Sequence, residues 1–141
     1  MSFLLDICFV SELSKRNRNP GVLAWLDDQD EAEIFLSTVT IGEIERGLTS
    51  HRDANRRKRL REFIEVEIVE RFRERTIGTD EPVWRRWGVL CGAADRAGKP
   101  LPVLDALIAA VAQVHGLTVV TRNESDFERC NVPIVNPWAA G

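Results

Sequence analysis

Cysteine and histidine are scarce in this chain of 141 residues. The three cysteines, Cys8, Cys91 and Cys130, lie far apart and form no Cys-x-x-Cys pair, and His51 and His115 are equally scattered. This spacing argues against a disulfide framework and fits a reducing cytoplasm. It also argues against a zinc site of the usual cysteine and histidine kind. A metal bound here would therefore need oxygen ligands.

Long apolar runs are missing as well. No stretch approaches the ~20 residues of a membrane helix. The apolar N-terminus lacks a basic leader and is interrupted by Asp6, so we expect a strand there and no signal peptide. Hydrophobic residues make up 44% of the chain and charged residues 29%. We therefore expect a soluble, cytoplasmic, single domain over residues 1–141, without membrane contact.

Short apolar segments alternate with segments of helical periodicity. The expected helices begin near residues 9, 20, 40, 52, 81 and 101. The expected strands cover residues 3–5, 34–39 and 117–121, with weaker candidates at 66–69, 76–77 and 133–135. The alternation predicts the α/β class, with a short central parallel sheet between two layers of helices. Ligands of such sheets bind at the carboxyl ends of the strands.

Asp105 is the residue that fits its surroundings least. It lies in an apolar helical segment, and its helical face continues through Ile108, Ala109 and Ala112. A buried, unpaired carboxylate costs several kcal/mol or shifts its pKa. Asp105 is therefore either a helix cap at the surface or the partner of a positive charge.

Three further acids follow expected strands or helix starts. Asp6 ends the first strand, Glu43 lies one turn into the helix after the second, and Asp126 comes shortly after residues 117–121. At one sheet edge, these acids and Asp105 would suit Mg²⁺ or Mn²⁺, which prefer oxygen ligands. Each acid also has a local explanation, as a helix cap, a capping box from Thr40 to Glu43, or a dipole-favoured first-turn residue. Periodicity alone leaves both explanations open.

The order and spacing of these blocks resemble those of PIN-domain ribonucleases, above all the toxins of VapBC toxin–antitoxin pairs. The resemblance covers nearly the whole chain. The blocks that carry it are Leu4-Leu5-Asp6, Thr40-Ile41-Gly42-Glu43-Ile44-Glu45-Arg46-Gly47, Leu101-Pro102-Val103-Leu104-Asp105-Ala106-Leu107-Ile108 and Thr118-Val119-Val120-Thr121-Arg122-Asn123-Glu124-Ser125-Asp126-Phe127.

The resemblance implies a single PIN-like domain and a Mg²⁺-dependent endoribonuclease, with Mn²⁺ as a substitute ion. By motif match, Asp6 and Asp105 would be the metal ligands. Glu43 and Asp126 would complete the catalytic set, with Asn123 as the alternative to Asp126. The implied partners are structured or single-stranded RNA, a VapB-type antitoxin and a second copy of the chain.

Ile7 and Cys8 depart from the family pattern. PIN domains usually have a small polar residue and then Asn or Ser after the first Asp. Ile7 and Cys8 are expected to lack the supporting hydrogen bonds of such residues, whose loss weakens metal binding ~10–100-fold. The alternative function is therefore a PIN-like domain with weak or no nuclease activity, acting by binding RNA or an antitoxin.

A run of basic residues, 56–61, contrasts with the net charge of −3. It predicts either a phosphate-binding face or a solvated helix face paired with nearby acids. Salt dependence of RNA binding separates these interpretations.

Overall fold

Five short parallel strands form the centre of the molecule. The computed structural model describes residues 1–140, so the expected domain span 1–141 ends one residue outside the described part. The strands pair in the order β3-β2-β1-β4-β5, and every pairing is parallel. Their bounds are β1 Phe3–Leu5, β2 Ile34–Ser37, β3 Thr76–Ile77, β4 Thr118–Val120 and β5 Ile134–Val135.

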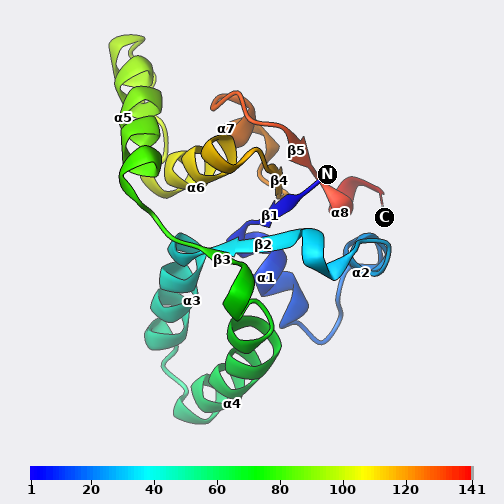
Figure 1. The fold of residues 1–141 in the computed structure, drawn as a ribbon. Helices are drawn as coiled ribbons and strands as arrows, with labels where there is room; N and C mark the ends of the chain where they lie inside the picture. The colour runs from blue at the N-terminus through cyan, green and yellow to red at the C-terminus, as the bar shows by residue number, and fades with distance from the viewer. Residues whose placement is uncertain (141) are drawn as a thin grey trace.

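The helices lie on both faces of this sheet. Helices α1, α3 and α4 lie on one side, and α5, α6 and α7 on the other (Figure 1). The helices are α1 Ile7–Leu13, α2 Pro20–Asp27, α3 Thr38–Ser50, α4 Ala54–Ile64, α5 Glu81–Arg96, α6 Val103–His115, α7 Glu124–Glu128 and α8 Pro137–Ala140, with single turns η1 Glu31–Glu33, η2 Glu65–Glu70 and η3 Arg73–Arg75. The predicted three-layer α/β/α architecture is confirmed. No helix among the described residues is long and apolar enough to cross a membrane.

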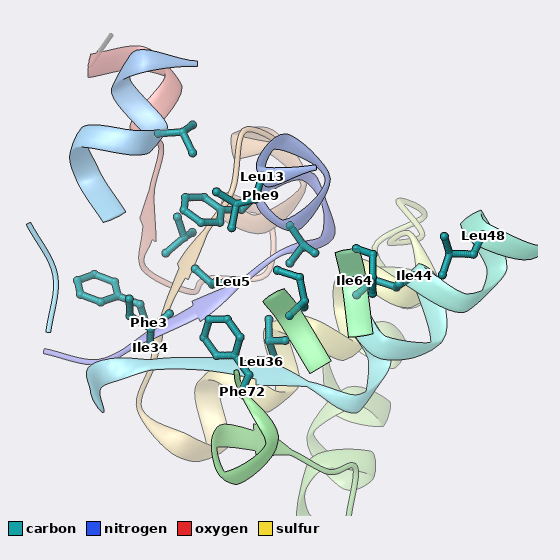
Figure 2. Close-up of a cluster of buried hydrophobic side chains, with 14 residues drawn as sticks. Phe3, Leu5, Phe9, Leu13, Ile34, Leu36, Ile44, Leu48, Ile64 and Phe72 are labelled. Carbon is teal, nitrogen blue, oxygen red and sulfur yellow. The ribbon is translucent and has the colours of Figure 1, made fainter. Parts of the chain in front are cut away.

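Alternation along the strands separates two hydrophobic clusters. Phe3 and Leu5 of β1 face the α1, α3 and α4 side, whereas Leu4 between them faces α5 and α6. Because strand side chains alternate between faces, each short strand contributes to both cores. Figure 2 shows the first cluster, in which Phe9 of α1 and Leu36 of β2 share the interior with Leu5.

The expected strand at residues 66–69 is wrong. This segment is the π-helical turn η2, which directly continues α4. The physical reason is a period of four: Ile64, Ile68 and Phe72 are all buried, so the helical face persists through the segment. The short apolar run Val66–Val69 is rich in β-branched residues and resembled a strand for that reason.

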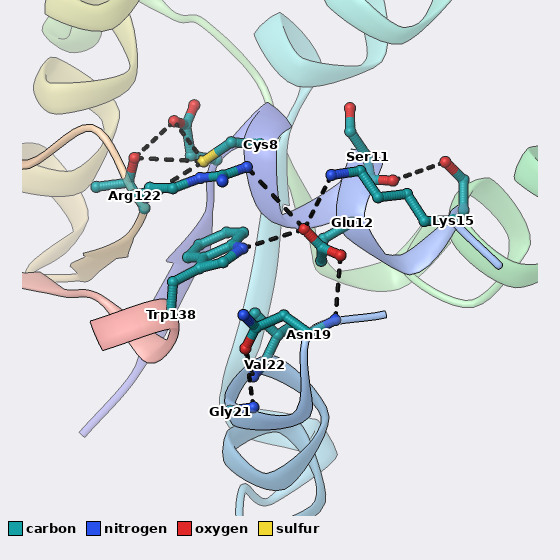
Figure 3. Close-up of polar contacts among 12 residues, drawn as sticks. Cys8, Ser11, Glu12, Lys15, Asn19, Gly21, Val22, Arg122 and Trp138 are labelled. Atoms are coloured by element: carbon teal, nitrogen blue, oxygen red, sulfur yellow. Dashed lines mark hydrogen bonds and ion pairs between the residues drawn. The ribbon is translucent and has the colours of Figure 1, made fainter. Parts of the chain in front are cut away.

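Glu12 is a buried carboxylate that joins α1 to the N-cap of α2 and to α8. Its side chain accepts hydrogen bonds from Trp138 Nε1 at 3.1 Å, the Asn19 backbone N–H at 3.1 Å and Lys15 Nζ at 3.2 Å (Figure 3). Burial alone would raise its pKa, but the hydrogen bonds from Trp138, Lys15 and Asn19 outweigh burial and lower the pKa of Glu12. The guanidinium of Arg122 lies over the Trp138 ring, with its Cζ atom 4.9 Å from the ring centroid.

Replacing Glu12 with Ala is expected to lower the free energy of unfolding by about 3 kcal/mol, because it leaves two partly buried donors unpaired. Since the folded pKa is lowered, the Glu12 contribution is present above the unfolded pKa and is lost as pH falls through the folded pKa. Urea denaturation at neutral and acidic pH measures both effects. Glu70→Ala, at an exposed pair with Arg73, serves as the control and should cost at most about 0.5 kcal/mol. Equal losses for the two variants would contradict this role of Glu12.

Candidate active site

The four predicted acids come from elements that meet at the carboxyl edge of the sheet. Strand β1 lies between β2 and β4, and the chain continues from β1 to β2 on one side and returns to β4 on the other. Ligands of open parallel sheets bind at this kind of switch point. Helix α3 starts at this edge directly after β2. Helix α6 runs back toward the start of β4, so its first turn also lies at the carboxyl edge.

Asp6 directly follows β1 and is buried. It occupies the N-cap position of α1, yet its side chain makes no capping hydrogen bond, so the cap explanation is wrong for Asp6. Instead Oδ2 accepts from Thr121 Oγ1 at 2.9 Å and from Cys8 Sγ at 3.4 Å. The other oxygen, Oδ1, is buried and has no hydrogen-bond partner among residues 1–140.

Cys8 therefore corrects one expectation from the sequence. Its thiol donates to Asp6 Oδ2 and also lies 3.4 Å from Thr121 Oγ1. Burial and the negative charge of Asp6 raise the pKa of Cys8 to about 11, so the thiol keeps its proton and can donate. Cys8 and Thr121 together supply the supporting hydrogen bonds that an Asn or Ser was expected to make.

Glu43 lies one turn inside α3. The helix begins at Thr38, and Ser37 caps it by accepting from the Val39 N–H at 3.0 Å. Thr40 is thus inside the helix and buried, so the alternative explanation of a capping box from Thr40 to Glu43 does not hold. Glu43 Oε1 is buried and has no hydrogen-bond partner within the described part of the chain. Burial, followed by the charges of Asp6 and Asp105, raises the pKa of Glu43 to about 7.

Asp105, Asn123 and Asp126 form a connected group. Asn123 Nδ2 donates to Asp105 Oδ2 at 3.2 Å and to Asp126 Oδ2 at 2.9 Å. Pro102 precedes the first residue of α6, so Asp105 lies in the first turn and caps nothing. Burial, then the charges of Asp6 and Asp126 and a hydrogen bond with Asp126, raise the pKa of Asp105 to about 6. Asn123 therefore links the two acids through its side-chain amide.

The structure places the four predicted acids near one another and adds two residues that the sequence analysis missed. The negative charges of Asp6 and Asp126 raise the pKa of Asp105, and those of Asp6 and Asp105 raise the pKa of Glu43, so the four carboxyl groups lie close enough to repel one another. The added residues are Thr121 and Cys8. The position of Thr121, directly after the clearest predicted strand, was the available signal for it. For Cys8, the departure from the family pattern predicted the opposite, namely that it would make no supporting hydrogen bond.

The donor chemistry fits a hard cation. The site offers carboxylate oxygens, and two of them, Asp6 Oδ1 and Glu43 Oε1, are buried and accept no hydrogen bond from any described residue. A buried acceptor without a donor is costly unless a cation or proton satisfies it. Among the described residues, no three acidic, histidine or cysteine side chains surround a single point with metal-ligand geometry.

This fold and site define a PIN domain. The PIN domain family matches residues 4–132, and the chain belongs to this family. The VapC ribonuclease Y4jK of Sinorhizobium fredii is 34% identical over 96% of this chain and 96% of its own length. Toxin FitB of Neisseria gonorrhoeae is 33% identical over 96% and 97%. The crystal structure of FitAcB from the same species superposes with a TM-score of 0.89 at 33% identity, covering 96% of this chain and 98% of that chain.

Proposed function

We propose that residues 1–141 form one PIN domain that acts in the cytoplasm as a Mg²⁺-dependent endoribonuclease and as the toxin of a toxin–antitoxin pair. The observation that carries the proposal is the pair of buried, partnerless oxygens on Asp6 and Glu43. They belong to a group of four mutually repelling carboxylates at the switch point of the sheet. The ribonuclease and toxin names of the relatives support the assignment.

Some residues of the site would hold an ion, and others would orient the ligands of that ion. Asp6 and Asp105 would hold Mg²⁺, with Mn²⁺ as a substitute, and Glu43 and Asp126 would complete the acidic site directly or through water. When bound, the ion supplies an activated water and neutralises charge that develops on the phosphodiester. Thr121 and Cys8 fix the orientation of Asp6, and Asn123 fixes Asp105 relative to Asp126. Such supporting hydrogen bonds set ligand geometry and metal affinity.

The proposed protein partners are a VapB-type antitoxin and a second copy of the chain. The name of the relative Toxin FitB supports an antitoxin as a partner of this chain. Exposed apolar side chains on the neighbouring helices α5 and α6 support a homodimer, because burying apolar surface favours association. They are Trp84 and Val89 of α5 and Val103 and Leu104 of α6.

Cleavage of an end-labelled single-stranded RNA by antitoxin-free protein tests this function. We expect cleavage with Mg²⁺ and none when EDTA replaces it, because phosphodiester hydrolysis at this site needs the ion. RNA binding without cleavage in Mg²⁺ would instead favour the alternative, a PIN-like domain that acts by binding. The thiol of Cys8 favours the active enzyme, since it restores a hydrogen bond to Asp6.

A further inference from the structure

A groove leads away from the acidic site along α1, α3 and α4. Its first part is lined by Glu43 of α3 and by Ile7 and Val10 of α1. Its second part is a wider hollow of about 870 Å³. The two parts share Ser11, Ser14, His51 and Leu60, so they form one continuous groove that starts at the candidate active site.

The far end of this groove is basic. Lys15, Arg16, Arg56 and Arg59 line it, and no Asp or Glu does so among the described residues. The charge therefore changes along the groove, from the carboxyl group of Glu43 at one end, through a largely apolar stretch, to guanidinium and ammonium groups at the other. A polyanion that enters the basic end would be led toward the site where a cation is expected.

The basic run of α4 separates into paired and unpaired members. Arg61 forms a two-pronged ion pair with Glu45, at 3.0 and 2.6 Å, and Arg57 donates to the His51 backbone carbonyl at 2.6 Å. Arg56 and Arg59 line the groove, and neither has an acidic partner within 4 Å among the described residues. The nearby Asp53 accepts hydrogen bonds from the Asn55 and Arg56 backbone N–H groups as the cap of α4.

We propose that this groove binds the backbone of single-stranded RNA, with Arg56 and Arg59 contacting phosphates on one side of the scissile bond. The proposal rests on the ribonuclease function proposed above and adds where its substrate lies. Two features favour RNA over a protein segment. The unpaired groups at the wide end are cations suited to phosphates. The groove also reaches Glu43, so one strand can contact both the basic end and the acidic site.

The test is the affinity for a short fluorescent single-stranded RNA, measured by anisotropy in EDTA so that no cleavage occurs. The groove variant is Arg56→Ala with Arg59→Ala. The matched control is Lys58→Ala with Arg96→Ala, which removes the same charge from exposed positions outside the groove lining. We expect the groove variant to bind on the order of tenfold more weakly and the control to bind within about twofold of wild type.

Salt dependence gives a second readout. For single strands, the slope of log affinity against log salt falls by about 0.7 for each lost phosphate contact, so the groove variant should lose about 1.4 of slope. Thermal melting checks that both variants fold. Equal affinity and slope for the groove variant and wild type would overturn the proposal. Unchanged RNA binding with weaker antitoxin binding would also overturn it and would make the groove a protein-docking surface.

A parallel cleavage assay in Mg²⁺ keeps the two proposals apart. If wild type cuts RNA but the groove variant binds like wild type, the groove proposal fails and the ribonuclease function stands. If wild type does not cut RNA, the proposed function fails, and the binding data in EDTA still decide whether the groove binds RNA.

Discussion

Replacing Asp105 with Asn is expected to lower the rate of RNA cleavage by about a thousand-fold. Asn keeps the shape of the side chain and its place beside Asn123, but it removes the negative charge. An ion held by Asp6 and Asp105 would lose an anionic ligand, and a loss of about 4 kcal/mol in transition-state stabilisation corresponds to that factor. Initial rates at saturating RNA and Mg²⁺ measure it.

Asp95→Asn is the matched control for this prediction. Asp95 is an exposed residue of α5 that none of the site hydrogen bonds involves. It should cut RNA within about twofold of wild type, as is usual for surface changes. Both variants should melt near the wild-type temperature. An Asp105→Asn enzyme that cuts as fast as the control would remove Asp105 from the catalytic set.

Without metal, the stability of the protein is expected to fall as pH rises from about 5 to about 8. The folded pKa of Glu43 is raised from 4.5 to about 7 and that of Asp105 from 3.8 to about 6. A raised folded pKa means that the contribution is present below the unfolded pKa and is lost as pH rises through the folded pKa. Both carboxylates are only half-buried, so water screening limits the expected loss to on the order of 2 kcal/mol.

Mg²⁺ should reverse this trend. An ion that binds only the native state adds about 2.7 kcal/mol at one hundred times its dissociation constant. Binding strengthens as the carboxylates lose their protons, so the largest gain should appear at the higher pH. Urea denaturation in EDTA and in Mg²⁺ across the range measures both effects. The double variant Glu43→Gln with Asp105→Asn is the control and should show neither. A wild-type profile that stays flat in EDTA and does not move with Mg²⁺ would contradict the prediction.

The sequence predicted the layers of the fold well because strong local signals agree with the packing. The fully buried β1 is apolar along its whole length, β4 is rich in β-branched residues, and Gly116 ends α6 in the left-handed conformation that glycine favours. The prediction for η2 was wrong because a short apolar run such as Val66–Val69 is compatible with both a strand and a helix. Only the packing of Ile64, Ile68 and Phe72 in three dimensions distinguishes the two.

The candidate site was predictable in its acids but not in their supporting groups. Asp6, Glu43, Asp105 and Asp126 each follow a strand or start a helix, so topology alone suggested one edge. The contact of Thr121 with Asp6 spans 115 residues and depends on the pairing of β1 with β4, whereas the contact of Cys8 with Asp6 spans only 2 residues. No local pattern encodes that pairing, so Thr121 was missed. Cys8 was expected to make no supporting hydrogen bond because it departs from the family pattern, and only the structure shows its thiol donating to Asp6.

The central claim is that these carboxylates share a divalent cation, and anomalous diffraction from crystals grown with Mn²⁺ tests it most directly. The expected result is an anomalous peak about 2.1 Å from carboxylate oxygens of both Asp6 and Asp105. The peak should be absent from crystals of Asp105→Asn grown in the same way. Wild-type crystals that show no peak at saturating Mn²⁺, or a peak away from Asp6 and Asp105, would contradict the claim.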